Sequence, residues 1–244
     1  MNNLKPYGSL CSLFYDTVKK YPTEKELTFY LNFFKKNPGR VLEAMCGSGR
    51  LLIPFTQHGN TTDGVDNSSA MLNRCKQRCS ELNLQPLLFE ATLDSFISPH
   101  SYTTVTIAVA SFQLITDRQA ALQSLQNLHK HMVRGGTLLI DIFVPDTSST
   151  ERFNRSAKIN NNTLIQLSTR YIFDEEKKIA DAFCTYELIV DGIVQQQEHE
   201  ILQITWYNDQ ELINLLNQAG FQVINFYDET FRSAGPSRIV HAQK

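Results

Sequence analysis

The sequence predicts an α/β fold in which a doubly wound, largely parallel sheet carries an inserted antiparallel β-sheet. Three features favour it. Residues 41–50 read as a short buried strand, a turn with Gly47 and Gly49, and the start of a helix, which is typical of a nucleotide-binding corner in such sheets. Strand-like and helix-like segments then alternate as far as residue 143. Residues 164–206 instead read as three consecutive strands, as in an antiparallel sheet.

The composition bounds the class of protein. The 244 residues, 42% hydrophobic and 20% charged, suit one large domain or a domain with an insertion. A net charge of −2 gives no general attraction to nucleic acid. The five cysteines are irregularly spaced and indicate free thiols in a reducing compartment, and no His or Cys cluster has metal-site spacing. The polar start and the lack of a long apolar run predict a cytoplasmic protein without a signal peptide or membrane span.

Residues 1–37 predict a helical cap. Apolar residues recur at helical spacing on both sides of Pro22, with Thr23 as the N-cap of the second helix. Two of the tyrosines here, Tyr15 and Tyr21, are expected to cover the core.

The glycine turn lets backbone amides approach a ligand with no side chain in the way. Leu52 stands where the dinucleotide fingerprint requires a third glycine, which weakens a phosphate-binding interpretation. Asp66 ends the next predicted strand, residues 62–66, where a carboxylate is placed to accept both hydroxyls of a ribose. The alternative is a helix N-cap, because Asn67 and Ser68 open a helix.

The remaining elements follow in order. The helix after Ser68 carries Arg74, Lys76, Arg78 and Glu81, which we expect on a solvated face. Further core strands are predicted at 87–90, 102–110 and 137–143, with a helix at 117–133 that Gly135 and Gly136 cap, and a loop at 145–160. The inserted strands, at 164–173, 179–190 and 193–206, are followed by a helix at 210–218 and an antiparallel pair at 221–227 and 237–242.

The glycine turn resembles motif I of the class I S-adenosylmethionine-dependent methyltransferases. Their acidic residue, three residues and Gly-x-Gly correspond to Glu43 and Gly47-Ser48-Gly49, although Met45 replaces the usual first glycine. The order of segments up to Ala219-Gly220-Phe221 and the last strand pair resembles the same family over nearly the whole chain. The resemblance implies a Rossmann-like, seven-stranded sheet with an antiparallel last strand. It divides the chain into a cap at 1–37, a core at 38–160 and 205–244, and an antiparallel insertion at 161–204 that serves as a lid or subunit interface.

The resemblance also implies S-adenosyl-L-methionine as the cofactor. Glu43 would act at its ammonium end, directly or through water, and Asp66 at its ribose. Met71 would lie under the adenine or serve as a core methionine, and Thr92 occupies the slot of the family's adenine-binding acid. The complete set of cofactor-binding candidates is Tyr15, Tyr21, Glu43, Met45, Gly47, Gly49, Asp66, Asn67, Met71, Thr92, Leu93, Ala110 and Phe112.

The segment that begins at Ser111 resembles the post-strand motif of small-molecule methyltransferases and lacks the Asn/Asp-Pro-Pro-aromatic signature of enzymes that methylate nucleobases or glutamine. We therefore expect methyl transfer to a nitrogen or oxygen of a small molecule, by a monomer or homodimer. Tyr15, Asp141 and Gln113 are the catalytic candidates, although Asp141 is equally suited to a structural role and Phe112 to core packing. Alternatives are a non-catalytic binding protein, a nicotinamide-binding protein, and a protein or tRNA methyltransferase.

Overall fold

The computed structural model describes residues 7–148, 152–228 and 237–244. These residues form two compact units. The smaller unit falls within Met1–Lys20 and Asp146–Thr205, and the larger one within Tyr21–Pro145 and Trp206–Lys244. The N-terminal helices are therefore divided between the units, whereas the sequence grouped residues 1–37 as one cap.

The larger unit contains a seven-stranded sheet in the order β10-β11-β5-β4-β1-β2-β3. All neighbouring strands are parallel except β11, which is antiparallel to both β5 and β10. This topology confirms the doubly wound, seven-stranded sheet with an antiparallel last strand. The strands are β1 (Val41–Ala44), β2 (Thr62–Asp66), β3 (Leu88–Glu90), β4 (Tyr102–Ile107), β5 (Met132–Phe143), β10 (Gln222–Tyr227) and β11 (Ser237–Gln243).

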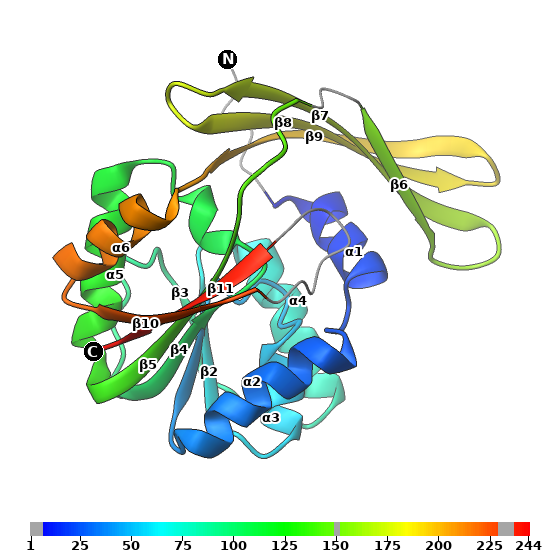
Figure 1. Ribbon diagram of the computed structural model, residues 1–244. Helices are drawn as coiled ribbons and strands as arrows, with labels where there is room; N and C mark the ends of the chain where they lie inside the picture. The colour runs from blue at the N-terminus through cyan, green and yellow to red at the C-terminus, as the bar shows by residue number, and fades with distance from the viewer. Residues whose placement is uncertain (1–6, 149–151, 229–236) are drawn as a thin grey trace. The chain divides into compact units, whose positions relative to one another are not determined.

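Helices pack on both faces of this sheet (Figure 1). One apolar cluster joins α2 and α3 to β1, β5 and β11, and another joins α5 and α6 to the opposite face. Side-chain oxygens of Thr23, Ser68, Asp117 and Asn208 cap the helix N-termini, which satisfies backbone donors that the helices leave unpaired. The helices are α2 (Glu24–Lys36), α3 (Leu52–Gln57), α4 (Ser69–Glu81), α5 (Arg118–Lys130) and α6 (Asp209–Gln218), with a short 3₁₀ turn, η1 (Ser111–Leu114).

The two glycines before residue 137 do not cap a helix as the sequence suggested. Helix α5 ends at Lys130, and β5 begins at Met132 and runs through both glycines. Gly135 has φ +75°, and the pairing of β4 with β5 shifts register between Tyr102 and Thr104. The glycine thus accommodates an irregularity in the strand, because only glycine adopts this φ without strain.

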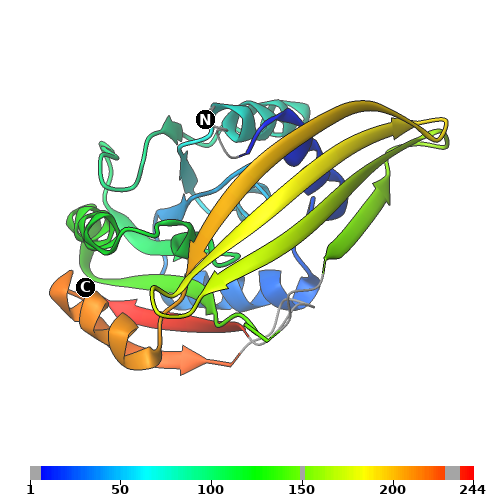
Figure 2. The same cartoon turned by 90° about the horizontal axis from the view of Figure 1, so that it is seen from above.

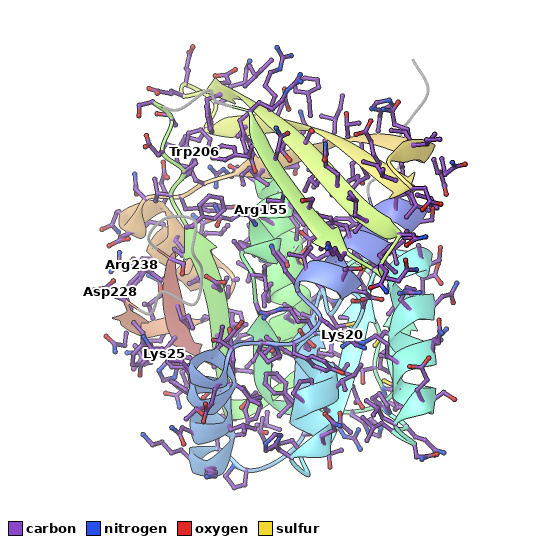
Figure 3. The ribbon with its side chains drawn as sticks, turned by 90° about the vertical axis from the view of Figure 1, so that its right-hand side faces the viewer. Lys20, Lys25, Arg155, Trp206, Asp228 and Arg238 are labelled. Carbon is purple, nitrogen blue, oxygen red and sulfur yellow. The ribbon has the colours of Figure 1, made fainter. Side chains whose placement is uncertain are left out.

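Arg238 fastens the C-terminal hairpin of the larger unit. Its guanidinium pairs with Asp209 at the start of α6 (2.6 Å) and with Asp228 just beyond β10 (2.9 Å; Figure 3). Both aspartates are exposed, so the pairs contribute little individually, but together they join β11 to two neighbouring elements.

The smaller unit is helix α1 (Ser9–Val18) and an antiparallel sheet in the order β6-β7-β8-β9. Strands β7 (Thr163–Asp174), β8 (Ile179–Val190) and β9 (Ile193–Thr205) are long and curved and run side by side (Figure 2). Strand β6 (Phe153–Lys158) lies in a stretch that was expected to be a loop. Its side chains are mostly exposed, and backbone pairing with β7 forms the strand without an apolar pattern.

Two carboxylates of β9 hold the N-terminus of α1. The α1 N-cap, Gly8, has no capping side chain, and Glu198 Oε2 accepts the N–H of Leu10 (3.0 Å) instead. Glu200 Oε2 accepts the N–H of Tyr7 (2.7 Å). A Cβ on Gly8 would lie 2.2 Å from Glu198 Oε1, so glycine lets the carboxylate approach. These hydrogen bonds, with the packing of the Phe14 ring of α1 on Tyr186 of β8, join α1 to the inserted sheet.

Candidate functional site

The turn after β1 has an unusual backbone. Met45, Gly47 and Gly49 have φ values of +60°, +55° and +82°. A Cβ on Gly49 would lie 2.7 Å from Sγ of Cys75 on α4, whereas a Cβ on Gly47 would meet only Met71 Sδ, at 3.9 Å. Gly49 therefore permits close packing on α4, and Gly47 leaves room beside the turn. Met45 shows that the position of the family's first glycine needs a left-handed φ here as well, which costs a non-glycine residue about 1–2 kcal/mol.

Asp66, at the end of β2, is hydrogen-bonded to this turn. Its Oδ2 accepts the N–H of Gly47 (2.8 Å) and its Oδ1 accepts the N–H of Ser68 (2.9 Å). Burial raises the pKa of Asp66, while these two backbone hydrogen bonds lower it. The N-cap of α4 is Ser68, whose Oγ accepts the N–H of Met71 (3.2 Å), so the alternative role for Asp66 as N-cap is wrong. Each carboxylate oxygen can accept a further hydrogen bond, and the neighbouring Asn67 is exposed.

Glu43 is a buried carboxyl group, and its hydrogen bonds and nearby positive charge do not fully offset the cost of burying its charge. It is 4% exposed, and within the described part of the chain its Oε2 has no hydrogen-bond partner. The nearby Arg50 forms a bidentate ion pair with Glu26 of α2, including an Nη1–Oε2 bond of 2.8 Å. Burial raises the pKa of Glu43 to about 8, against the opposing effects of Arg50 and a hydrogen bond from the Leu52 backbone. An unpaired buried carboxyl oxygen is well suited to a cationic group.

Asp141 faces the same side of the sheet as Glu43. Residues two apart in a strand point to the same face of the sheet. Glu43 lies two residues after Val41, and Asp141 lies two residues after Leu139. Val41 and Leu139 both belong to the apolar cluster that packs on α2 and α3. The Tyr30 ring of α2 is fully buried there, and burial together with the charges of Asp141, Glu26 and Glu43 raises the Tyr30 pKa. Asp141 is itself 4% exposed. Its predicted role as a base stays a prediction. The structure places it with Glu43 and Tyr30 on the buried face of the sheet that α2 and α3 cover.

The segment after β4 carries several predicted residues. Val109 and Ala110 have φ values of +57° and +53°, and η1 follows directly. Phe112 is fully buried and stacks on Tyr207, with ring centroids 6.0 Å apart. The side-chain amide of Gln113 accepts the N–H of Phe143 (2.8 Å) and donates to its carbonyl (2.9 Å). Gln113 therefore joins η1 to the end of β5, and its predicted catalytic role stays a prediction.

The adenine-side candidates differ in accessibility. Met71, next to Gly47, is 3% exposed, and Leu93 is 4% exposed and belongs to the core cluster. Thr92 is exposed, and its Oγ1 lies 2.7 Å from Ser95 Oγ. Met71 and Leu93 thus have the burial of packing residues, while Thr92 offers a solvent-facing hydroxyl.

The two tyrosine candidates lie in different units. Tyr21 belongs to the larger unit and is 52% exposed, and the Arg78 guanidinium carbon lies 5.5 Å from its ring centroid. Tyr15, on α1, belongs to the smaller unit. Its ring centroid lies 6.1 Å from that of Tyr7 and 5.1 Å from Nζ of Lys19. Within the larger unit the structure therefore brings together Tyr21, Glu43, Gly47, Asp66 and Met71 around the turn.

The expectation of a solvated face for Arg78 was wrong. Arg78 is 7% exposed, and its Nη1 donates to the Ser48 carbonyl (2.8 Å) in the middle of the glycine turn. A signal for this was present, since Arg78 lies two helical turns beyond Met71 and so falls on the buried stripe of α4. Its partner, however, is distant in the chain and was not evident.

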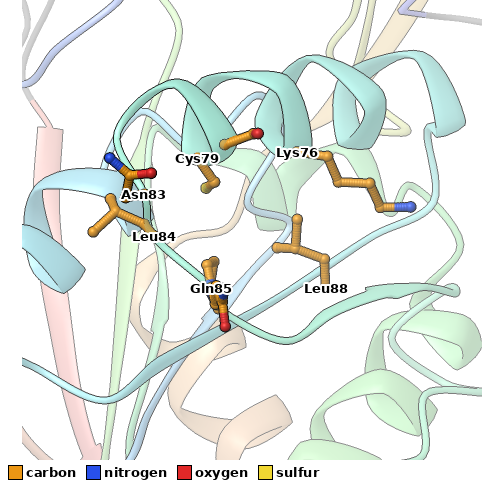
Figure 4. Close-up of a pocket in the computed structure, with 8 residues that line it drawn as sticks. Lys76, Cys79, Asn83, Leu84, Gln85 and Leu88 are labelled. Atoms are coloured by element: carbon orange, nitrogen blue, oxygen red, sulfur yellow. The ribbon is translucent and has the colours of Figure 1, made fainter.

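A hollow of about 300 Å³ lies beside the C-terminal half of α4 (Figure 4). Its lining contains none of the predicted cofactor residues: Lys76, Cys79, Ser80, Asn83, Leu84, Gln85, Pro86 and Leu88. We assign no function to it. Among the described residues, no three His, Cys, Asp or Glu side chains gather as metal ligands, and no described helix is long and apolar enough to cross a membrane.

Residues 41–136 match the family model described as a methyltransferase domain. The match covers less than half of the chain. It spans the glycine turn, Asp66, Met71 and the segment after β4, and leaves Asp141, Tyr15 and Tyr21 outside. The match agrees with the predicted enzyme class.

Solved structures share the fold over nearly the whole chain. An S-adenosylmethionine-dependent methyltransferase from Clostridium acetobutylicum ATCC 824 is 15% identical and has a TM-score of 0.79, covering 95% of this chain and 96% of its own. DesVI of Streptomyces venezuelae is 15% identical with a TM-score of 0.77, covering 95% and 96%. The CcbJ methyltransferase of Streptomyces caelestis is 15% identical with a TM-score of 0.76, covering 98% of both chains. These matches confirm the predicted Rossmann-like methyltransferase fold.

A curated relative matches part of the chain. The protein named "Putative methyltransferase YqeM", from Bacillus subtilis (strain 168), is 23% identical over 130 residues. The match spans about half of this chain and about half of that relative, 52% in each case.

Proposed function

We propose that this chain transfers the methyl group of S-adenosyl-L-methionine to a nitrogen or oxygen of a small molecule. The observation that carries the proposal is the turn between β1 and α3, with the buried Glu43 carboxyl before it and the Asp66 carboxylate bonded to it. A ligand with a cationic amino-acid end and a ribose matches these two groups. The methyltransferase domain at residues 41–136 supports the same interpretation.

The residues of the turn fit this cofactor. Glu43 Oε2, buried and without a partner among the described residues, would receive the ammonium group, and Asp66 would accept the ribose hydroxyls. The space beside Gly47, next to Met71, would admit the chain between them. When bound, the cofactor supplies a methyl group that its sulfonium already activates.

The protein's contribution is to hold and orient the reactants. Gln113 joins η1 to the end of β5 through Phe143, at the sheet edge where ligands of open α/β sheets bind. Alignment of nucleophile, methyl carbon and sulfur in a water-poor site accounts for much of the rate in such displacements. A base is needed only for an acceptor that arrives protonated, and Tyr15 and Asp141 remain the proposed candidates.

The solved neighbours suggest where to look for the acceptor. CalS10 of Micromonospora echinaspora is described as an amino pentose methyltransferase and KedS8 of Streptoalloteichus sp. ATCC 53650 as a sugar N-methyltransferase. They are 13% and 15% identical to this chain and share its fold. We therefore choose amino sugars as the first acceptors to screen. Action in the cytoplasm, as a monomer or homodimer, with the inserted sheet as a lid or subunit interface, stays part of this proposal.

The test is a transfer assay with methyl-labelled S-adenosyl-L-methionine and a panel of amines and alcohols, including amino sugars. We expect labelled product from one acceptor class and none from the Asp66→Ala variant. Binding of S-adenosyl-L-homocysteine without transfer to any acceptor would favour the non-catalytic alternative. That alternative rests on Met45 and Thr92, which depart from the family pattern. Equal labelling by wild type and Asp66→Ala would refute the assigned site.

A further inference from the structure

Arg78 reaches from α4 to the middle of the glycine turn. Its Nη1 donates to the Ser48 carbonyl at 2.8 Å and approaches Ser48 Oγ at 3.4 Å. Arg78 and Ser48 are 7% and 8% exposed. A hydrogen bond from a charged donor in such a buried position is stronger than one between neutral groups, so this contact restrains the turn.

The turn needs such restraint because two of its residues are glycines. Glycine loses more conformational freedom on ordering than any other residue. The Gly47 N–H is held from β2 by Asp66 (2.8 Å), and the Gly49 N–H donates to the carbonyl of Cys46 (3.0 Å). Arg78 adds a contact to Ser48, between the glycines, from a different element. The turn is therefore held from β2 on one side and from α4 on the other.

Tyr21 contacts the same guanidinium. Its ring centroid lies 5.5 Å from the Arg78 guanidinium carbon, within the range of a cation–π interaction. Tyr21 is 52% exposed and precedes α2, whereas the turn follows β1. One arginine thus contacts both a half-exposed aromatic ring and the backbone of the turn.

We propose that Arg78 is a positioning residue that couples the Tyr21 ring to the glycine turn, so that ordering of the ring and binding of the cofactor strengthen each other. This inference rests on the proposed function, which makes the turn a cofactor site. Arg78 acts through Ser48 and does not touch the reacting atoms. Because the contact orders the turn before the ligand arrives, its loss lowers affinity rather than altering the chemistry.

The variants separate the parts of this coupling. Arg78→Met removes the charge and the donors but keeps an unbranched side chain, and Arg78→Lys keeps the charge. Tyr21→Leu removes the ring, and the double variant with Arg78→Met completes a cycle. Lys76→Met, on an exposed position of the same helix, is the matched control.

Two readouts are measured, and one of them needs no ligand. Calorimetric titration with S-adenosyl-L-homocysteine should show a dissociation constant raised about tenfold or more by Arg78→Met, as for loss of a buried charged hydrogen bond. Tyr21→Leu should raise it about two- to fivefold and should add nothing once Arg78 is replaced. Arg78→Lys should retain part of the affinity. In the ligand-free protein, hydrogen exchange of the Gly49 amide should speed up in Arg78→Met and stay unchanged in Lys76→Met.

The outcomes are distinguishable. Wild-type protein that fails to bind the ligand contradicts the proposed function, and the exchange of the Gly49 amide then still tests whether Arg78 restrains the turn. If the ligand binds but the two substitutions weaken it by independent factors, or exchange of the Gly49 amide is unchanged in Arg78→Met, the coupling is refuted. Should Arg78→Met not fold, Arg78→Lys and Tyr21→Leu complete the same cycle.

Discussion

Replacing Glu43 with glutamine should change how the stability of the protein depends on pH. The carboxyl is buried in β1, and its main counter-charge, Arg50, is engaged by Glu26. Its pKa of about 8, against an ordinary value of 4.5, means that between these pH values the folded chain keeps a proton that the unfolded chain has released. Raising the pH through this window withdraws that proton, so the free energy of unfolding falls as pH rises from 4.5 to 8.

The magnitude follows from the same pKa difference. A shift of one unit corresponds to about 1.4 kcal/mol, so the full shift sets an upper limit of about 5 kcal/mol. A glutamine side chain at this position would keep a similar shape without an ionisable group, so the variant should gain stability relative to wild type as pH rises. We expect the difference between pH 5 and pH 8 to be at least about 1.4 kcal/mol, or roughly 3–6 °C in melting temperature for a chain of this size.

Thermal and urea unfolding of wild type and Glu43→Gln from pH 5 to pH 8 measures this effect. Glu90→Gln is the control, because Glu90 is exposed at the end of β3 and should leave the pH profile unchanged. Parallel profiles for wild type and Glu43→Gln would show that Glu43 is ionised throughout and would remove the argument for an undercompensated carboxyl.

Three further substitutions test the site. Asp66→Asn should weaken binding of S-adenosyl-L-homocysteine by about 1–3 kcal/mol, because an amide cannot accept at both ends; unchanged affinity by calorimetry would remove Asp66 from the site. Gly49→Ala should lower the melting temperature markedly, since its Cβ would lie 2.7 Å from Cys75 Sγ, and the doubly substituted Gly49→Ala/Cys75→Ala chain should recover part of the loss; no recovery would contradict the packing argument. Gln113→Leu should cost about 1–3 kcal/mol of unfolding free energy, because it removes two hydrogen bonds to the Phe143 backbone; an activity loss at unchanged stability would instead favour a catalytic amide.

Local patterns predicted the parts of the fold whose causes lie close together in the chain. The turn at residues 45–49 is recognisable because its glycines adopt positive φ values, and Asp66 because it ends an apolar strand. The alternation of strands and helices predicted the parallel sheet, since each element buries its own apolar pattern. Ribose binding by Asp66 stays a prediction, and its bonds to Gly47 and Ser68 needed the structure.

Contacts between distant segments were not predictable in this way. Arg78 looked like part of a charged helix face, and only the fold brings Ser48, 30 residues away, to its guanidinium. Helix α1 is capped by Glu198, 188 residues beyond Leu10, so its membership of the inserted unit left no local signal. Strand β6 is polar and exposed, and its pairing with β7 depends on backbone bonds that periodicity does not reveal.

The function proposed for this chain requires that the turn between β1 and α3 bind S-adenosyl-L-methionine. The most direct measurement is calorimetric titration of the purified chain with S-adenosyl-L-homocysteine, with NAD titrated in parallel. We expect saturable one-to-one binding of the first ligand, weakened in Asp66→Asn, and no binding of NAD. Binding of NAD alone, or binding of neither ligand by the folded protein, would contradict it.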